Sequence, residues 1–143
     1  MKNKIVDYFS DKDNGLTGIV IQNKYGHFYG GTKFNPEDDK NTFSNFAGSR
    51  YAEIRAGEKF ARFRYKQEKI KLKAIQDLMN DIKRNCPEEI EKNPKLMRRI
   101  NLKLRDYTQS VEDWNNLSNY LKESVSKQVE EREKILSRSN TIK

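Results

Sequence analysis

The chain has 143 residues, of which 34% are hydrophobic and 35% are charged. This length fits one domain, and the low apolar content predicts a thin core of the kind found in elongated helical proteins. The formal net charge of +8 favours anionic partners such as nucleic acid, a nucleoprotein or an acidic protein face. Aromatic residues make up 10% of the chain, which argues against a wholly disordered polyelectrolyte.

Cysteine and histidine each occur once, as Cys86 and His27. A single cysteine excludes an intrachain disulfide, and together the two residues are too few for a zinc site of cysteine and histidine. We therefore expect no metal and no cofactor. There is no signal-peptide pattern and no apolar run near the length of a membrane-spanning helix, so we expect a cytoplasmic protein without membrane contact.

Residues 1–40 are expected to form a small β element. Three segments have strand character: Lys4 to Phe9, Leu16 to Gln22 and His27 to Phe34. Asn23 to Gly26 supplies a hairpin turn in which Gly26 can adopt a positive φ. Because a lone hairpin is marginally stable, we expect it to pair with the first segment or to pack on a helix.

Ser49 to Arg84 has the periodicity of one long helix, with Gly48 and Gly57 as places where it could break. Six cations recur at steps of three and four and share one helical face about 27 Å long. They are Arg55, Lys59, Arg62, Lys66, Lys69 and Lys73, and we call them the basic face. Tyr51 and Tyr65 lie beside it and could either stack on bases or pack within the protein. The alternative is a solvated face whose charges are partly paired by Glu58 and Glu68.

A second long helix is expected after Cys86-Pro87, with Asn93 as its N-cap and Pro94 at its first position. Ser110 begins a pattern like a capping box, so an interruption there is open. The short connection favours an antiparallel helical hairpin over residues 41–143, with Trp114 buried against the first helix near Leu72, Ile75 or Met79. The expected fold is α+β and predominantly helical, with the small antiparallel sheet and the helical hairpin in one structural unit.

A nuclease is one functional alternative. Gly18-Ile19-Val20 and Phe28-Tyr29-Gly30 resemble the two strand signatures of GIY-YIG nucleases. The resemblance implies a catalytic role for Tyr29, for an arginine such as Arg50 or Arg55, and for a metal-binding glutamate. Val20 stands where that family has its first tyrosine, and Phe28-Tyr29 permutes the second signature. We therefore expect no catalytic residue and no enzyme.

A second resemblance covers the middle of the chain. Gly31 to Asp39, followed by Phe43, Gly48, Ala52-Glu53 and Arg55-Ala56, resembles a family of small proteins from phages and prophages of Gram-positive bacteria. In that family a strand, a Pro-Glu-Asp bend and a Gly…Ala…Arg-Ala helix follow one another, and a cysteine usually stands where this chain has Phe34. The resemblance implies a phage accessory protein in the host bacterial cytoplasm, and no reaction.

The sequence thus predicts a non-enzymatic accessory protein that binds nucleic acid or a host nucleoprotein complex through its basic face. Inhibition of a host defence nuclease, as anti-CRISPR proteins do, is one form of this function. A coiled-coil structural or interaction protein with no nucleic-acid role is the main alternative, and a homodimer is open in either case.

Overall fold

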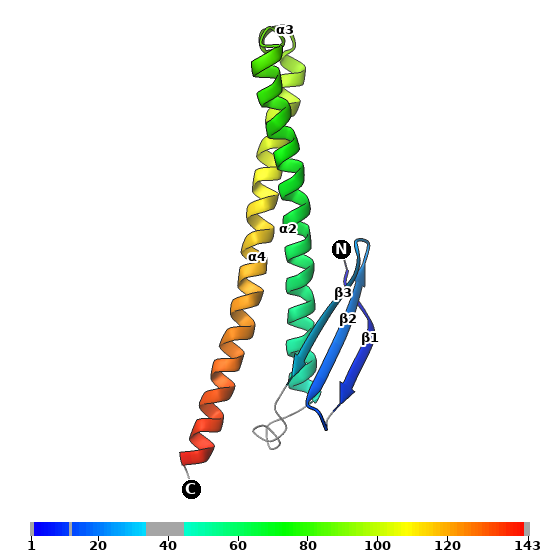
Figure 1. Ribbon diagram of the computed structural model, residues 1–143, viewed down its shortest axis with the longest axis vertical. Coiled ribbons are helices and arrows are strands. Elements are labelled where there is room, and N and C mark those ends of the chain that lie inside the picture. Colours follow the sequence, from blue (N-terminus) through cyan, green and yellow to red (C-terminus); the bar gives the residue numbers. More distant parts are fainter. Residues whose placement is uncertain (1, 12, 34–44, 142–143) are drawn as a thin grey trace. The chain divides into compact units, whose positions relative to one another are not determined.

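The computed structural model describes residues 2–11, 13–33 and 45–141, and within the helices it describes side chains at residues 48–127. The fold is α+β and predominantly helical, as predicted (Figure 1). The described elements, in chain order, are β1 (Lys4–Asp11), β2 (Leu16–Asn23), β3 (Gly26–Lys33), α2 (Asn45–Asn85), α3 (Glu89–Lys92) and α4 (Pro94–Thr141).

The chain divides into two compact units. The first contains Met1–Phe60 and Leu117–Lys143, so it holds the sheet, the first turns of α2 and the last turns of α4. The second contains Ala61–Asn116, which is the rest of α2, all of α3 and the rest of α4. The boundary that we expected at residue 40 lies outside the described residues.

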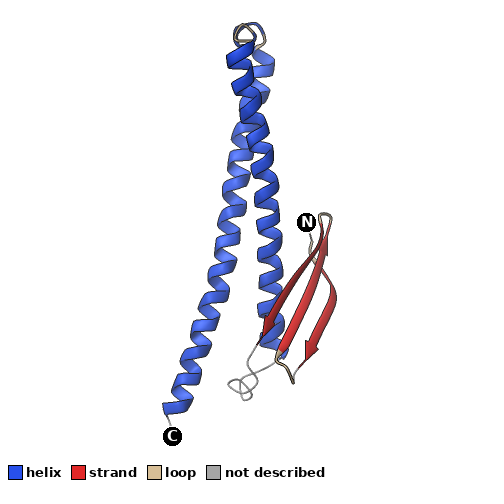
Figure 2. Cartoon of the chain, in the orientation of Figure 1, coloured by secondary structure: helices blue, strands red, loops and turns tan. Residues whose placement is uncertain are grey.

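The sheet has three antiparallel strands in the order β1-β2-β3 (Figure 2). The β2–β3 turn has the predicted form, with Gly26 at φ 131° and the Asn23 side-chain oxygen accepting a hydrogen bond of 2.8 Å from the Tyr25 amide. The register places Val20 opposite Tyr29 and Gly18 opposite Gly31. The first segment does pair with the hairpin, as β1, with a register shift between Ile5 and Asp7.

The side chains of β2 alternate between a buried face and an outer face. Thr17, Ile19 and Ile21 are buried on the face that meets α2. The outer face of β2 carries Gly18 and Val20, which pair with β3 residues on the same side.

Small residues bring α2 close to the sheet. A methyl group at Gly30 would collide with the Ala52 carbonyl and the Ala56 amide of α2. A methyl group at Gly48 would lie 2.5 Å from the Thr17 hydroxyl oxygen. Gly48 is therefore a contact residue of an unbroken helix and does not mark a break. The larger Phe60 closes the same interface, with its ring centroid 5.0 Å from that of Phe28.

In the second unit, α2 and α4 form the predicted antiparallel hairpin. Its buried cluster is Ile82, Met97 and Ile100, and the hydrophobic residues packed on it are Ile75, Met79, Leu96 and Leu104. Asn93 caps α4 as expected, because its side-chain oxygen accepts a 3.3 Å hydrogen bond from the Leu96 amide. The interruption left open at Ser110 is absent, since α4 runs unbroken from Pro94 to Thr141.

Trp114 lies against α2, as expected, and the contact that the structure shows for it is with Arg64. Its ring is partly buried and faces the Arg64 guanidinium, whose Cζ lies 5.3 Å from the ring centroid. Arg64 in turn contacts the buried carboxylate of Glu68 at 3.1 Å. The Trp114 ring therefore covers the ion pair of Arg64 and Glu68. From the 3-4 pattern alone, we had expected purely apolar contacts at this position of the hairpin.

Replacing Gly30 by alanine should destabilise the fold by roughly 1–3 kcal/mol or more, because the new methyl group meets backbone atoms of α2 that cannot rotate away. The matched control is Gly31→Ala, whose methyl group meets only the far end of the Tyr29 side chain. Urea unfolding should show a clear loss of stability for the first variant and a small one for the second. Equal losses would contradict the close approach of α2 to β3.

Arg64→Met should cost about 3 kcal/mol, at the low end of the range for breaking a buried ion pair, because the buried Glu68 carboxylate keeps only the exposed Lys71 as a cationic partner. The double variant Arg64→Met, Glu68→Met should recover most of that stability, since it removes both charges and keeps apolar volume under Trp114. Unfolding free energies of the single and double variants check this. Additive destabilisation would show that the two side chains do not act as a pair.

Candidate nucleic-acid interface

One helix positions every member of the basic face. Arg55 and Lys59 lie on α2 in the unit that contains the sheet, and the other members follow on α2 in the second unit. All six side chains, Arg55, Lys59, Arg62, Lys66, Lys69 and Lys73, are exposed. The exposure of these six side chains therefore agrees with the prediction from their helical spacing.

The charges of the basic face are not neutralised within the described part of the chain. There, no ion pair joins any of the six cations to a carboxylate. Glu68, which we expected to pair some of them, is buried and contacts Arg64 at 3.1 Å and Lys71 at 3.3 Å. Neither belongs to the basic face, so that part of the expectation was wrong. Exposed cations that hold no carboxylate can neutralise phosphates at little internal cost.

The exposure of the two tyrosines bears on whether they stack on bases or pack within the protein. Tyr51 and Tyr65 are both partly buried. The Lys69 ammonium lies 5.6 Å from the centroid of the Tyr65 ring. Tyr65 therefore supports a cation of the basic face, and its position favours packing over free stacking on a base.

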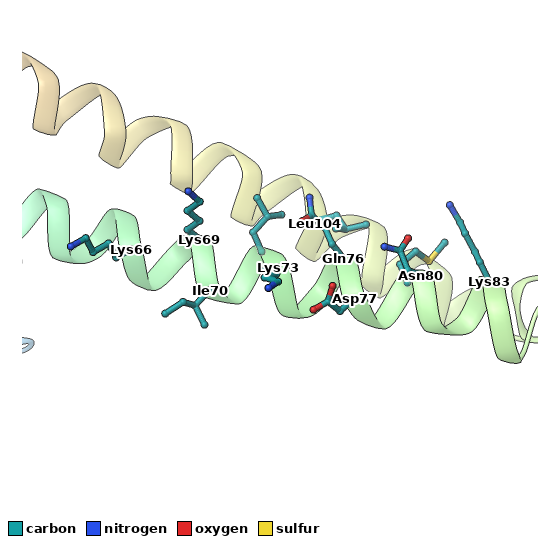
Figure 3. A pocket seen from close by; sticks show the side chains of 11 residues that line it. Lys66, Lys69, Ile70, Lys73, Gln76, Asp77, Asn80, Lys83 and Leu104 are labelled. Atoms are coloured by element: carbon teal, nitrogen blue, oxygen red, sulfur yellow. The ribbon is translucent and has the colours of Figure 1, made fainter.

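A hollow with a volume of about 1040 Å³ lies in the second unit, along α2. Figure 3 shows lysines projecting from α2 around it, with Leu104 supplied by α4. Its cations are Lys66, Lys69, Lys73 and Lys83, and Asp77 is the one acid among the lining residues. Ile70 also lines it and is 71% exposed. The hollow thus combines positive charge with uncovered apolar surface.

A smaller hollow of about 430 Å³ lies in the first unit, where β3 meets α2. We call it the Tyr29 hollow. Among its lining residues are Phe9, Tyr29, Gly31, Lys33, Arg55 and Lys59. The Lys59 ammonium lies 5.1 Å from the centroid of the Tyr29 ring. Two members of the basic face thus meet an exposed tyrosine on the sheet.

Sequence reasoning considered Tyr29 as part of a nuclease signature and did not group Tyr29 or Lys33 with the basic face. The strand alternation on β3, which puts Tyr29, Gly31 and Lys33 on one face, was the available signal. Their approach to Arg55 and Lys59 was not readable, because it depends on how α2 packs against β3.

The nuclease signatures fall on paired strands. Val20 lies directly opposite Tyr29, and Arg55 lines the same hollow as Tyr29, whereas Arg50 lines a different one. Searching the described residues finds no group of three or more histidine, cysteine or acidic side chains placed to hold a metal ion. The described residues therefore place no cluster of metal-ligating side chains beside these signatures.

None of the helices within residues 45–141 is both long and apolar enough to cross a membrane. Comparison of the chain with protein-family models, with curated proteins and with solved structures finds no match. The resemblance to phage and prophage proteins therefore rests on the sequence motif alone. Among the described residues of that motif, Gly48, Ala52 and Ala56 lie where α2 contacts the sheet.

Proposed function

We propose that this chain is a non-enzymatic accessory protein of a phage or mobile element that binds nucleic acid, alone or within a host nucleoprotein complex, through the basic face of α2. The observation that carries the proposal is that six exposed cations share one helical face and make no ion pair with a described carboxylate. Phosphate contacts of this kind supply most of the affinity in non-specific nucleic-acid binding.

Inhibition of a host defence nuclease is the biological role that this proposal favours. A basic protein that occupies the nucleic-acid channel of such a complex needs no catalytic residue of its own. It acts in the cytoplasm of the host bacterium, where the target complex and its nucleic acid are present.

A protein-interaction role is the second candidate. It is favoured by the hollow along α2, where exposed Ile70 lies among four lysines. A surface that combines apolar and basic side chains suits an acidic amphipathic helix, including one supplied by a coiled-coil partner or a second copy of this chain.

Neutralising the basic face should weaken nucleic-acid binding without unfolding the chain, since exposed charges contribute little to stability. The variant is Arg62→Gln, Lys66→Gln, Lys69→Gln. In a binding titration at several salt concentrations, the slope of log affinity against log salt should flatten by about one unit for each phosphate that the variant no longer neutralises.

The matched control for that variant is Lys92→Gln, Lys95→Gln, Arg99→Gln, which removes the same charge from exposed positions in α3 and α4. The control should retain nearly the wild-type affinity and salt slope. Equal weakening in both triple variants would mean that net charge alone drives binding, and would contradict the assignment to the basic face.

Purified protein should not cleave plasmid DNA or single-stranded RNA in the presence of Mg²⁺ or Mn²⁺, because its described residues assemble no metal-dependent centre. The assay follows substrate length on a gel over time. Cleavage that disappears in Tyr29→Phe would overturn this expectation and favour the GIY-YIG-like nuclease.

A further inference from the structure

The outer face of the sheet carries two exposed aromatic side chains beside glycines. Phe9 is 49% exposed and Tyr29 is 50% exposed. A methyl group at Gly18 would lie 3.0 Å from Cε2 of Tyr29 and 3.1 Å from Cδ1 of Phe9. A methyl group at Gly31 would lie 2.5 Å from the Tyr29 hydroxyl oxygen. The two rings therefore lie close against the sheet, because Gly18 on β2 and Gly31 on β3 have no side chains that would hold them away.

Positive charge borders this platform on the β3 side. Lys33 comes from β3, while Arg55 and Lys59 come from α2, and all three are exposed and line the Tyr29 hollow. Described carboxylates form no ion pair with them.

The β1 strand supplies the opposite charge. Asp7 and Asp11 lie two residues before and two residues after Phe9 on this strand. Hydrogen bonds from the side chain and then the backbone of Asn14 hold the pKa of Asp11 below its usual value.

This asymmetry selects a ligand with one anionic edge and one flat apolar body. A nucleotide has this form, because its phosphate carries the charge and its base has two π faces. Aromatic side chains on an open sheet with cations at one border are a recurring platform for unpaired bases. A duplex does not fit this arrangement, because its base faces are covered by their stacked neighbours. The hollow, at about 430 Å³, lies within the size range of small-ligand sites.

We propose that the Tyr29 hollow binds one nucleotide of a single-stranded nucleic acid, with the base over Phe9 and Tyr29 and the adjoining phosphate against Arg55, Lys59 and Lys33. This inference rests on the proposed function, since it requires that the chain bind nucleic acid. The base occupies the ring face over which the Lys59 ammonium now lies, and the flexible lysine side chain turns to the phosphate.

The test compares single-stranded and double-stranded oligonucleotides of one sequence by fluorescence anisotropy. Tyr29→Leu should weaken single-strand binding by about 5-fold or more, the effect of removing one stacked base, and should leave duplex binding unchanged. Tyr29→Phe keeps the ring and should bind as wild type. The matched control is Tyr120→Leu, which removes another exposed tyrosine of the same unit, on α4, and should change neither affinity.

Two further measurements sharpen the test. Ultraviolet crosslinking to a strand that contains 5-iodouracil should attach the oligonucleotide at Tyr29 or Phe9, as identified by peptide mass spectrometry. A mononucleotide at the concentration of the oligonucleotide should not compete. Equal competition would overturn the assignment to a strand, and Tyr29→Leu binding single strands as tightly as wild type would overturn the site itself.

The outcomes separate this inference from the proposed function. If wild-type protein binds no oligonucleotide, both fail. If neutralising the basic face flattens the salt slope while Tyr29→Leu has no effect on single-strand binding, the proposed function stands and only the Tyr29 hollow is rejected.

Discussion

The close approach of α2 to the sheet is the constraint on which the first unit depends. It is possible because Gly30 on β3 faces Ala52 and Ala56 on α2, where any larger side chain would meet the helix backbone. The approach has a consequence for charge as well as for packing. It sets Arg55 and Lys59, which lie on the same turns of α2 as these alanines, at the border of β3. A helix held farther away by larger residues would leave the two cations separate from Tyr29.

In the second unit, the constraint on α2 is how charged side chains are accommodated in its contact with α4. The charged fraction of the chain is high, so some charges must be accommodated where α2 and α4 meet. Arg64, Glu68 and Trp114 do this together, because the arginine lies between a buried carboxylate and an aromatic face. The pairing withdraws Glu68 from the surface. The lysines of the basic face are consequently left without that carboxylate, which strengthens the local positive field available to an anionic partner.

Periodicity and turn chemistry predicted most of the fold. Alternation and Gly26 predicted the hairpin, and the 3-4 spacing with Asn93 and Pro94 predicted the two long helices. The exposed basic face followed from the same spacing. Periodicity gives the face on which a residue lies but not its partner across an interface. For that reason the contact of Trp114 with Arg64 was not predicted, Glu68 was placed among surface charges, and the contact of Tyr29 with Lys59 was missed.

Lysine footprinting tests most directly whether a nucleic acid binds to the basic face of α2, because it reports which lysines the nucleic acid covers. The protein is acetylated with and without a bound oligonucleotide, and each lysine is quantified by mass spectrometry. We predict protection of Lys59, Lys66, Lys69 and Lys73, all exposed in the free chain, with little change at Lys92, Lys95 and Lys122. Protection centred on the second group, or no protection at a concentration that saturates binding, would contradict the assignment of the interface to the basic face of α2.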